Sequence, residues 1–156
     1  MATFMTRSAE AISRNMAFAT LRFSGDRLDP DRITGILGVE PTKAFREGQR
    51  YFAGPRAGYV IGRTGVWVFA TDGVVDSAEL DRHLEHLVKL IFARPNWEGR
   101  LKELQRLMSD DGVKADFSGF WRGGPGIQPP TLSEEAMRKL RQLPAEIETD
   151  FEVSQV

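Results

Sequence analysis

The sequence contains no cysteine and only two histidines, and these absences exclude several kinds of chemistry. Without cysteine the chain forms no disulfide, no thiolate zinc site, no iron–sulfur cluster and no cysteine nucleophile. A chain without thiols suits a reducing compartment, so we expect a cytoplasmic protein. Apolar runs stay well short of the roughly 20 residues that span a bilayer, so we expect no membrane partner.

The glycine motifs of the common enzyme classes are also missing. The loop at 123–126 follows a predicted strand and precedes a predicted helix, as a phosphate-binding loop does. It lacks the Lys-Ser/Thr of a Walker motif and the dinucleotide fingerprint, and Pro129 and Pro130 remove amide donors that a phosphate needs. No serine lies in a nucleophile elbow, and no pair of carboxylates stands out as acid and base. We therefore expect no catalytic residue and no cofactor, and a protein that is not an enzyme.

The two histidines, His83 and His86, are spaced i and i+3 on a predicted helix, with Glu79 one turn earlier. Residues at this spacing lie close enough to share a metal ion. A catalytic zinc helix spaces its histidines i and i+4 instead, and no third ligand is obvious. His83 borders the apolar stripe and His86 lies further out, so we predict surface or boundary histidines and no metal site.

The length and composition fit a single globular domain. The chain has 156 residues, of which 41% are hydrophobic and 28% are charged. A chain of this size buries about 70% of the surface that it exposes when unfolded. Residues 1–15 are small, polar and weakly patterned, so we expect a weakly ordered N-terminal extension followed by one domain over residues 16–156.

Charge is distributed unevenly along the chain. Residues 1–71 carry ten Lys and Arg against six Asp and Glu, whereas residues 72–156 carry eleven against sixteen. Two interpretations remain open: opposite faces of one domain complement each other, or the first half forms a basic patch for an acidic partner. A sequence pI near 6.1 argues against nucleic-acid binding.

Hydrophobic periodicity predicts the secondary structure. Alternating or apolar runs predict strands at 16–24, 42–47, 66–71, 113–121 and 146–153. Apolar stripes predict a helix after Asp29, two helices separated by Pro95, and one over 133–143. Asp29 has the position of an N-cap and Gly38 that of a left-handed C-terminal stop. We expect a cap at Asp76 or Ser77 for the second helix, a Thr131–Glu134 capping box for the last, and a long loop rich in glycine and arginine over 48–65.

The predicted order β-α-β-β-α-α-β-α-β indicates a single layered α+β domain. We expect a mixed, largely antiparallel sheet of about five strands, with helices packed mainly on one face. The other face should carry Arg22, Lys114, Asp116 and the acidic row of the last strand. In that strand we place Ile147, Thr149, Phe151 and Val153 toward the core.

A distinctive pattern of turns and core positions runs along the chain: Leu21-Arg22-Phe23-Ser24-Gly25, Leu28-Asp29-Pro30, Ile33, Leu37-Gly38, Pro41-Thr42, Gly48, Trp67 and the Gly-Pro-Gly loop before Leu132. Over about residues 16–153 this pattern resembles a bacterial family known as domain of unknown function 4279. These residues are caps, turns and core positions. The resemblance therefore implies a fold and supplies no catalytic residues.

The most distinctive cluster of polar and aromatic residues lies in and beside the predicted loop. It consists of Arg46, Arg50, Tyr51, Arg56, Tyr59 and Arg63, with Trp121 and Arg122 beside the second glycine-rich loop. Arg and Tyr favour contact surfaces because they combine planar apolar area with hydrogen-bond donors. The alternative is a mobile, solvated loop.

Three functions follow from these observations. We favour a non-enzymatic protein-interaction module of bacterial type, accessory or immunity-like, that uses the arginine and tyrosine cluster or the polar sheet face. The alternative is a small anionic-ligand-binding domain or an unrecognised enzyme, with Arg22, Arg46 and Arg122 and either Trp67 or Trp121 lining a pocket. A homo-oligomer that pairs through its sheet face or edge is the third.

Overall fold

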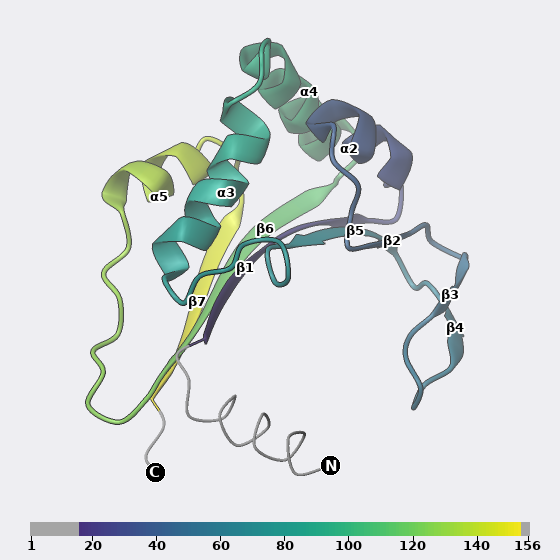
Figure 1. The fold of residues 1–156 in the computed structure, drawn as a ribbon. Coiled ribbons are helices and arrows are strands. Elements are labelled where there is room, and N and C mark those ends of the chain that lie inside the picture. The colour runs from purple at the N-terminus through teal and green to yellow at the C-terminus, as the bar shows by residue number, and fades with distance from the viewer. Residues whose placement is uncertain (1–15, 154–156) are drawn as a thin grey trace.

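A five-stranded sheet is the centre of the computed structural model, which describes residues 16–153. The predicted extension, residues 1–15, lies outside the described residues. The strands are β1 (Met16–Gly25), β2 (Lys43–Phe45), β5 (Gly65–Ala70), β6 (Lys114–Gly123) and β7 (Glu146–Val153), arranged in the order β2-β5-β1-β6-β7 (Figure 1). All neighbouring pairs are antiparallel except β6 and β7, which are parallel. This is the mixed, largely antiparallel sheet that the sequence predicts.

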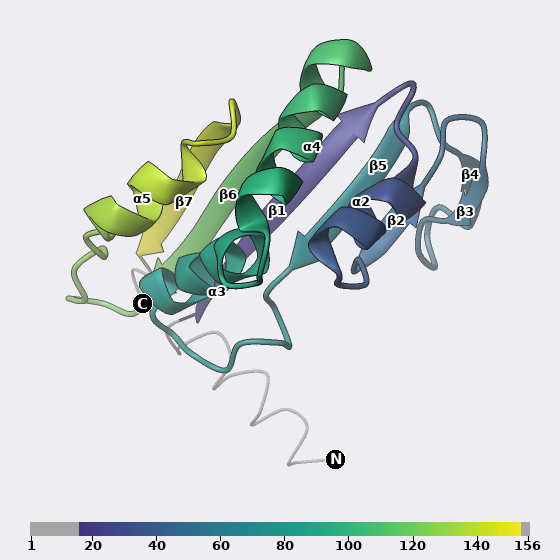
Figure 2. The same ribbon diagram turned by 90° about the horizontal axis from the view of Figure 1, so that it is seen from above.

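The helices cover one face of the sheet (Figures 1 and 2). They are α2 (Pro30–Leu37), α3 (Leu80–Phe92), α4 (Trp97–Asp110) and α5 (Glu134–Leu140). A separate two-stranded hairpin, β3 (Arg50–Phe52) and β4 (Tyr59–Ile61), projects beside β2 on the side of the sheet away from the helices (Figure 1). The predicted α+β class, with helices on one face, is confirmed.

The core lies between the sheet and the helices because side chains alternate between the two faces of a strand. Leu21 and Phe23 of β1, Trp67 of β5 and Phe117 of β6 point toward the helices and are at most 1% exposed. Trp67 also donates a hydrogen bond through Nε1 to Thr34 Oγ1 of α2, at 3.0 Å. Burying a large apolar side chain contributes about 1.5–3 kcal/mol relative to leaving it exposed, so the layer between the sheet and the helices is a main source of stability.

The opposite face of the sheet combines an aromatic pair with an ion pair. Phe18 of β1 and Phe120 of β6 stack with ring centroids 5.0 Å apart. On the same face Arg22 Nε donates to Asp116 Oδ2 at 3.1 Å across the β1–β6 ladder. The predicted polar face therefore exists, with an aromatic pair of the central strands beside its charges.

The predicted boundaries of the first helix are confirmed. Asp29 Oδ1 accepts a hydrogen bond from the backbone amide of Asp31, and Pro30 begins the helix. Gly38 ends it with φ of 69°, in the left-handed region that glycine adopts without a Cβ clash.

Three local predictions are wrong. Residues 48–65, predicted as a long loop, contain the β3–β4 hairpin. Helix α3 begins after Glu79, which makes no side-chain cap, so neither Asp76 nor Ser77 is its N-cap. Helix α5 is capped by Ser133, whose hydroxyl accepts from the Ala136 amide, and not by a Thr131–Glu134 box. In each case several neighbouring residues fit the predicted turn or cap, and the sequence does not show which of them the backbone uses.

The last strand is only partly covered by helices. Phe151 and Val153 lie on the helix side of β7, as predicted, but are 37% and 44% exposed. Helix α5 packs against α3, and β7 is the edge of the sheet. The predicted burial of Phe151, Val153 and Thr149 is therefore wrong, because no helix reaches this end of the strand among the described residues.

His83 is buried, in contrast to the predicted boundary position. Its side chain is 1% exposed, with Nε2 2.7 Å from the Ser77 carbonyl oxygen and Nδ1 2.7 Å from Thr71 Oγ1. Since a carbonyl only accepts, Nε2 donates to the Ser77 carbonyl, while Nδ1 lies within hydrogen-bond distance of the Thr71 hydroxyl, which donates to the Ala19 carbonyl at 3.2 Å. That hydroxyl oxygen also accepts from the Ala19 amide at 2.8 Å. The network ties α3 and the segment before it to the central strand. Both imidazole nitrogens of His83 are engaged in it, so neither is left to coordinate a metal ion.

Replacing His83 with Leu should lower the free energy of unfolding by about 1–3 kcal/mol, because buried hydrogen-bonding groups lose their partner. Chemical denaturation monitored by tryptophan fluorescence measures the change. The exposed neighbour Glu85 provides the control, and Glu85→Gln should stay within about 0.5 kcal/mol of the wild type. Equal stability of the two variants would show that the network does not hold α3 to β1.

His86 should titrate below the ordinary histidine pKa of about 6.5. Burial against Phe69, with ring centroids 5.8 Å apart, and the nearby charge of Lys89 lower its pKa. The unfolded chain therefore binds the proton first, and this group makes stability fall as the pH drops below about 6.5 and rise as pH returns through that window. An NMR titration of the ring protons measures the midpoint. A midpoint above 6.5 would contradict the argument.

Candidate functional site

The β3–β4 hairpin is held against the edge of the main sheet by stacked side chains. Phe45 at the end of β2 stacks on Tyr51 of β3, with ring centroids 3.9 Å apart and planes 2° from parallel. Lys43 Nζ lies 4.6 Å from the centroid of the Tyr51 ring. A Cβ at Gly62 would lie 2.8 Å from Phe45 Cδ2 and from the Arg46 carbonyl oxygen, so only glycine allows this close approach.

Backbone hydrogen bonds close both ends of the hairpin. At its base the Gly48 amide donates to the Gly62 carbonyl and the Gly62 amide to the Gln49 carbonyl, both at 2.8 Å. At its tip the Gly58 amide donates to the Gly54 carbonyl at 2.8 Å. Gly54 and Gly58 have positive φ, which the turn requires. The glycines that suggested a loop are thus the turn residues of a hairpin.

One face of the hairpin packs toward β2, and the other is exposed. Cross-strand pairing places Arg50 opposite Ile61 and Phe52 opposite Tyr59, so these four side chains share the outer face. Phe52, Tyr59 and Ile61 are 56%, 64% and 67% exposed. The outer face is therefore more apolar and more exposed than a strand pair normally is in water.

The aromatic side chains of the outer face contact one another and an arginine. Phe52 and Tyr59 meet edge to face at 5.4 Å, and the Arg50 guanidinium lies 4.4 Å from the centre of the Tyr59 ring. Such contacts order the rings without removing them from water. The surface is thus arranged in advance of any binding event.

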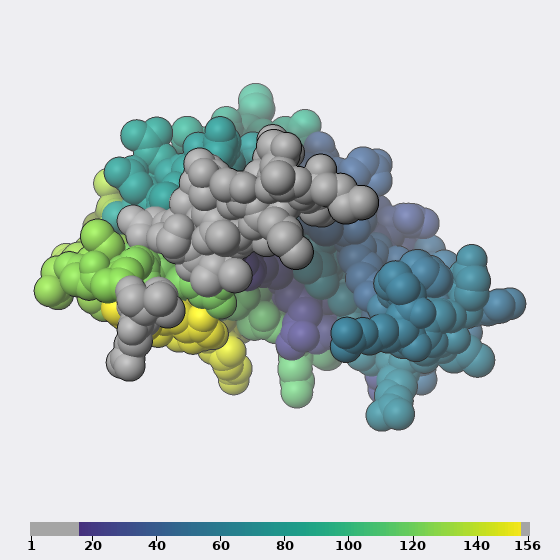
Figure 3. All heavy atoms as spheres, turned by 60° about the horizontal axis from the view of Figure 1, so that its bottom comes forward, coloured from purple at the N-terminus to yellow at the C-terminus, as the bar shows by residue number. Residues whose placement is uncertain are grey.

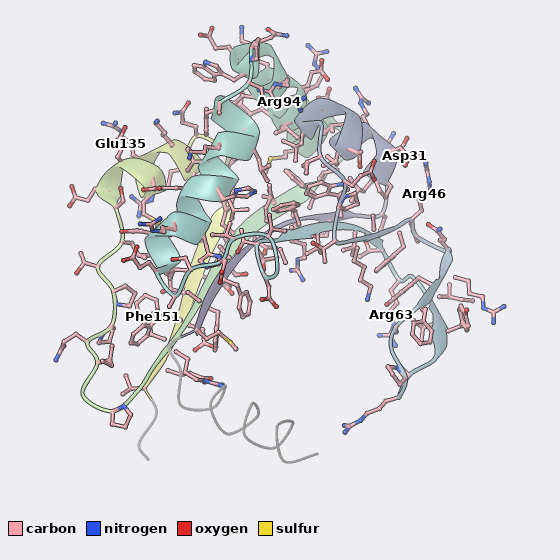
Figure 4. All side chains as sticks on the ribbon, viewed as in Figure 1. Asp31, Arg46, Arg63, Arg94, Glu135 and Phe151 are labelled. Carbon is pink, nitrogen blue, oxygen red and sulfur yellow. The ribbon has the colours of Figure 1, made fainter. Side chains whose placement is uncertain are left out.

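Three arginines give the hairpin its positive charge. Arg50 lies on the outer face, and Arg56 is exposed in the turn between the two strands. Arg63, labelled in Figure 4, lies in the segment that leads to β5. Among residues 16–153, none of the three forms an ion pair with a carboxylate. We call Arg50, Phe52, Arg56, Tyr59, Ile61 and Arg63 the hairpin patch.

The structure separates the remaining predicted site residues from the hairpin patch. Arg46 bridges Asp29 and Asp31 at 2.8 and 3.1 Å and fixes the start of α2 to β2 (Figure 4). Tyr51 is half-buried on the inner face of the hairpin, where it stacks on Phe45. Trp67 and Trp121 are 0% and 4% exposed and belong to the core.

The three arginines considered for an anionic ligand do not converge. Arg22 pairs with Asp116, Arg46 with the α2 acids, and Arg122 with Glu152 at 2.8 Å. A groove of about 500 Å³ lies near one of them, lined by Arg22, Lys114, Asp116, Glu146, Met108 and Pro144 among others. Its lining includes Asp116 and Glu146 as well as Arg22 and Lys114, so it does not concentrate positive charge.

Sequence reasoning missed Phe52 and Ile61, which provide most of the apolar surface of the hairpin patch. The signal was present, because Arg50-Tyr51-Phe52 and Tyr59-Val60-Ile61 are two β-favouring triplets separated by a Gly-Pro turn. Each triplet is shorter than the four to eight residues over which alternation of apolar and polar side chains predicts a strand.

The described part of the chain contains no group of three or more histidine, aspartate or glutamate side chains placed to hold a metal ion. In residues 16–153 there is also no helix with the length and apolar character to cross a membrane.

Comparison with known proteins gives one match. No curated protein and no solved structure matches the chain. A family model described as a domain of unknown function matches residues 14–154, nearly the whole chain, and confirms the resemblance carried by the turn and core residues. The chain belongs to that family, DUF4279.

Proposed function

We propose that the chain is a non-enzymatic protein-interaction module that binds an acidic protein surface through the hairpin patch. The observation that carries the proposal is the exposed outer face of the hairpin, where three large apolar side chains are more than half exposed. Contiguous exposed apolar groups that are rimmed by polar ones mark interaction sites.

The chemistry of the patch specifies the partner. Aromatic and arginine side chains dominate binding energy at protein interfaces, because they bury large planar areas and donate several hydrogen bonds. The free charges of Arg50, Arg56 and Arg63 favour carboxylates on the partner and disfavour basic surfaces. We therefore expect a partner with an apolar centre and an acidic rim.

The rigidity of the hairpin supports a binding role over a solvated loop. The Phe45–Tyr51 stack and the backbone bonds at both ends fix the strands before binding. A preformed surface loses little conformational entropy when it binds. Such a module fits an accessory or immunity-like protein of the bacterial cytoplasm.

Site-specific photocrosslinking in cells tests this proposal. A benzophenone amino acid at Tyr59 should crosslink to a protein, because Tyr59 lies at the centre of the patch. The same probe at Val74, which is 56% exposed but lies outside the hairpin, should crosslink far less. Equal capture at the two positions, or capture of nucleic acid in place of protein, would contradict the proposal.

A charge-reversal variant provides the matched test. Arg50→Glu, Arg56→Glu and Arg63→Glu together should abolish the Tyr59 crosslink, while the melting temperature stays close to that of the wild type because exposed substitutions change stability little. Arg32→Glu, Arg106→Glu and Arg138→Glu make the same change in net charge on exposed helix positions and should leave the crosslink intact. If both triple variants bind alike, net charge and not the hairpin patch decides binding.

A further inference from the structure

The groove of about 500 Å³ that is lined by residues of β6, β7 and α4 has no part in the proposed function. Its volume lies within the range of about 300–1,000 Å³ that small-molecule sites occupy. The strand order places β6 and β7 at the opposite edge of the sheet from β2, beside which the hairpin lies. Figure 3 shows the hairpin (blue) and β7 (yellow) on opposite sides of the molecule. An occupant of the groove is therefore independent of the hairpin patch.

The groove lies where the edge of β6 has no neighbouring strand. β6 begins at Lys114, whereas β7 joins it only from Asp116 onward, where Asp116 pairs with Glu146. Over Lys114 and Ala115 the described chain places no strand on this side of β6. The backbone N–H and C=O groups of a strand edge can pair with another main chain. The groove thus suits a ligand that itself carries amino-acid or peptide groups.

The groove also has apolar surface, contributed by parts of the chain that are distant in sequence. Met108 of α4, Val113 before β6 and Pro144 before β7 are among the residues that line it. Gln105, also in α4, donates through Nε2 to the Gln142 carbonyl at 3.0 Å and so ties the helix to the segment that leads to β7. An apolar group of a ligand can pack against this surface, which is held in place before binding.

Two charged side chains of the groove have no partner of opposite sign. Arg22 and Asp116 pair with each other at 3.1 Å. Among residues 16–153, neither Lys114 nor Glu146 forms an ion pair. Glu146 lies opposite Asp116, and Lys114 precedes Asp116 by two residues on the same face. From the usual strand spacing and rise, the Cα atoms of Lys114 and Glu146 lie about 8 Å apart. The groove therefore presents one free positive and one free negative group at a short separation.

We infer that this groove binds a zwitterion with an apolar side chain, either a free α-amino acid or a short peptide. Lys114 Nζ donates to the carboxylate of the ligand, the Glu146 carboxylate accepts from its ammonium group, and the apolar side chain packs against Met108 and Pro144. A ligand with a single charge leaves one of the two protein charges without a partner, so it binds more weakly. A phosphate is disfavoured further, because Glu146 repels it.

Backbone amide NMR of the full chain, titrated with L-leucine and separately with L-leucyl-L-leucine, tests the inference. The amide signals of Lys114, Ala115 and Met108 should shift and reach saturation. Tighter binding of leucine identifies a free amino acid as the ligand, and tighter binding of leucyl-leucine identifies a short peptide. If neither compound gives saturable shifts of these amides, the inference is overturned.

Three analogues of leucine show whether both charges are recognised. 4-Methylpentanoate lacks the ammonium group, 3-methylbutylamine lacks the carboxylate, and N-acetyl-L-leucine amide carries no charge. Each should bind at least about tenfold more weakly than leucine, because at least one charge-assisted hydrogen bond is lost. An analogue that binds as tightly as leucine would contradict recognition of a zwitterion.

Two variants assign the contacts to individual residues. Lys114→Gln should weaken leucine binding about tenfold and leave the binding of 3-methylbutylamine unchanged, whereas Glu146→Gln should weaken leucine binding and leave that of 4-methylpentanoate unchanged. Lys102→Gln and Glu103→Gln, at exposed positions of α4 outside the groove, are the matched controls and should bind leucine like the wild type. All four side chains are exposed, so the melting temperature should change little. Variants of Lys114 and Glu146 that bind leucine like the controls would overturn the inference.

Discussion

The alternation of side chains along β1 is the constraint on which the other layers depend. β1 is hydrogen-bonded on both sides, to β5 and to β6, so it fixes the register of both neighbours. A shift of one residue would turn Leu21 and Phe23 outward and bring Arg22 into the core. The Thr71 hydroxyl, which bonds the Ala19 amide and His83, extends this register to α3. The position of every helix thus follows from one strand.

The hairpin depends on the same sheet through a much smaller contact. Phe45 belongs to β2 yet lies on the face away from the helices, where Tyr51 covers it. This stack makes a segment of two three-residue strands part of the fold, whereas an isolated hairpin of that size is at best marginal in water. The exposed aromatic face is therefore available because a buried aromatic pair holds it in place.

Much of the fold could be predicted from the sequence because its signals are local. Asp29, Pro30 and Gly38 define a helix by the geometry of its ends, and the alternation of β1, β6 and β7 defines strands by period. The burial of His83 could not be predicted, because it depends on Thr71 and on the Ser77 carbonyl, which the chain brings together only after folding. The exposure of Phe151 could not be predicted for the same reason. It depends on where α5 packs in the folded chain, and α5 does not cover this end of β7.

The candidate site was predicted in its charged part and missed in its apolar part. Arg50, Arg56, Tyr59 and Arg63 stood out by composition, and the structure places the first three on the hairpin and Arg63 in the segment that follows it. Arg46, Arg22 and Arg122 shared that composition, but each is paired with a carboxylate from a distant part of the chain or a neighbouring strand. Residue type therefore identified candidates, and only the fold distinguished an arginine that is free to bind from one that stabilises the domain.

The parallel pairing of β7 with β6 has a consequence for how the domain assembles. An antiparallel partner can follow through a tight turn, whereas β7 reaches its register only after the chain has crossed over through α5. Until that crossover is made, β6 is the border of the sheet on this side and the indole of Trp121 lacks its Phe151 neighbour. The addition of the acidic strand then replaces an aromatic border with a charged one.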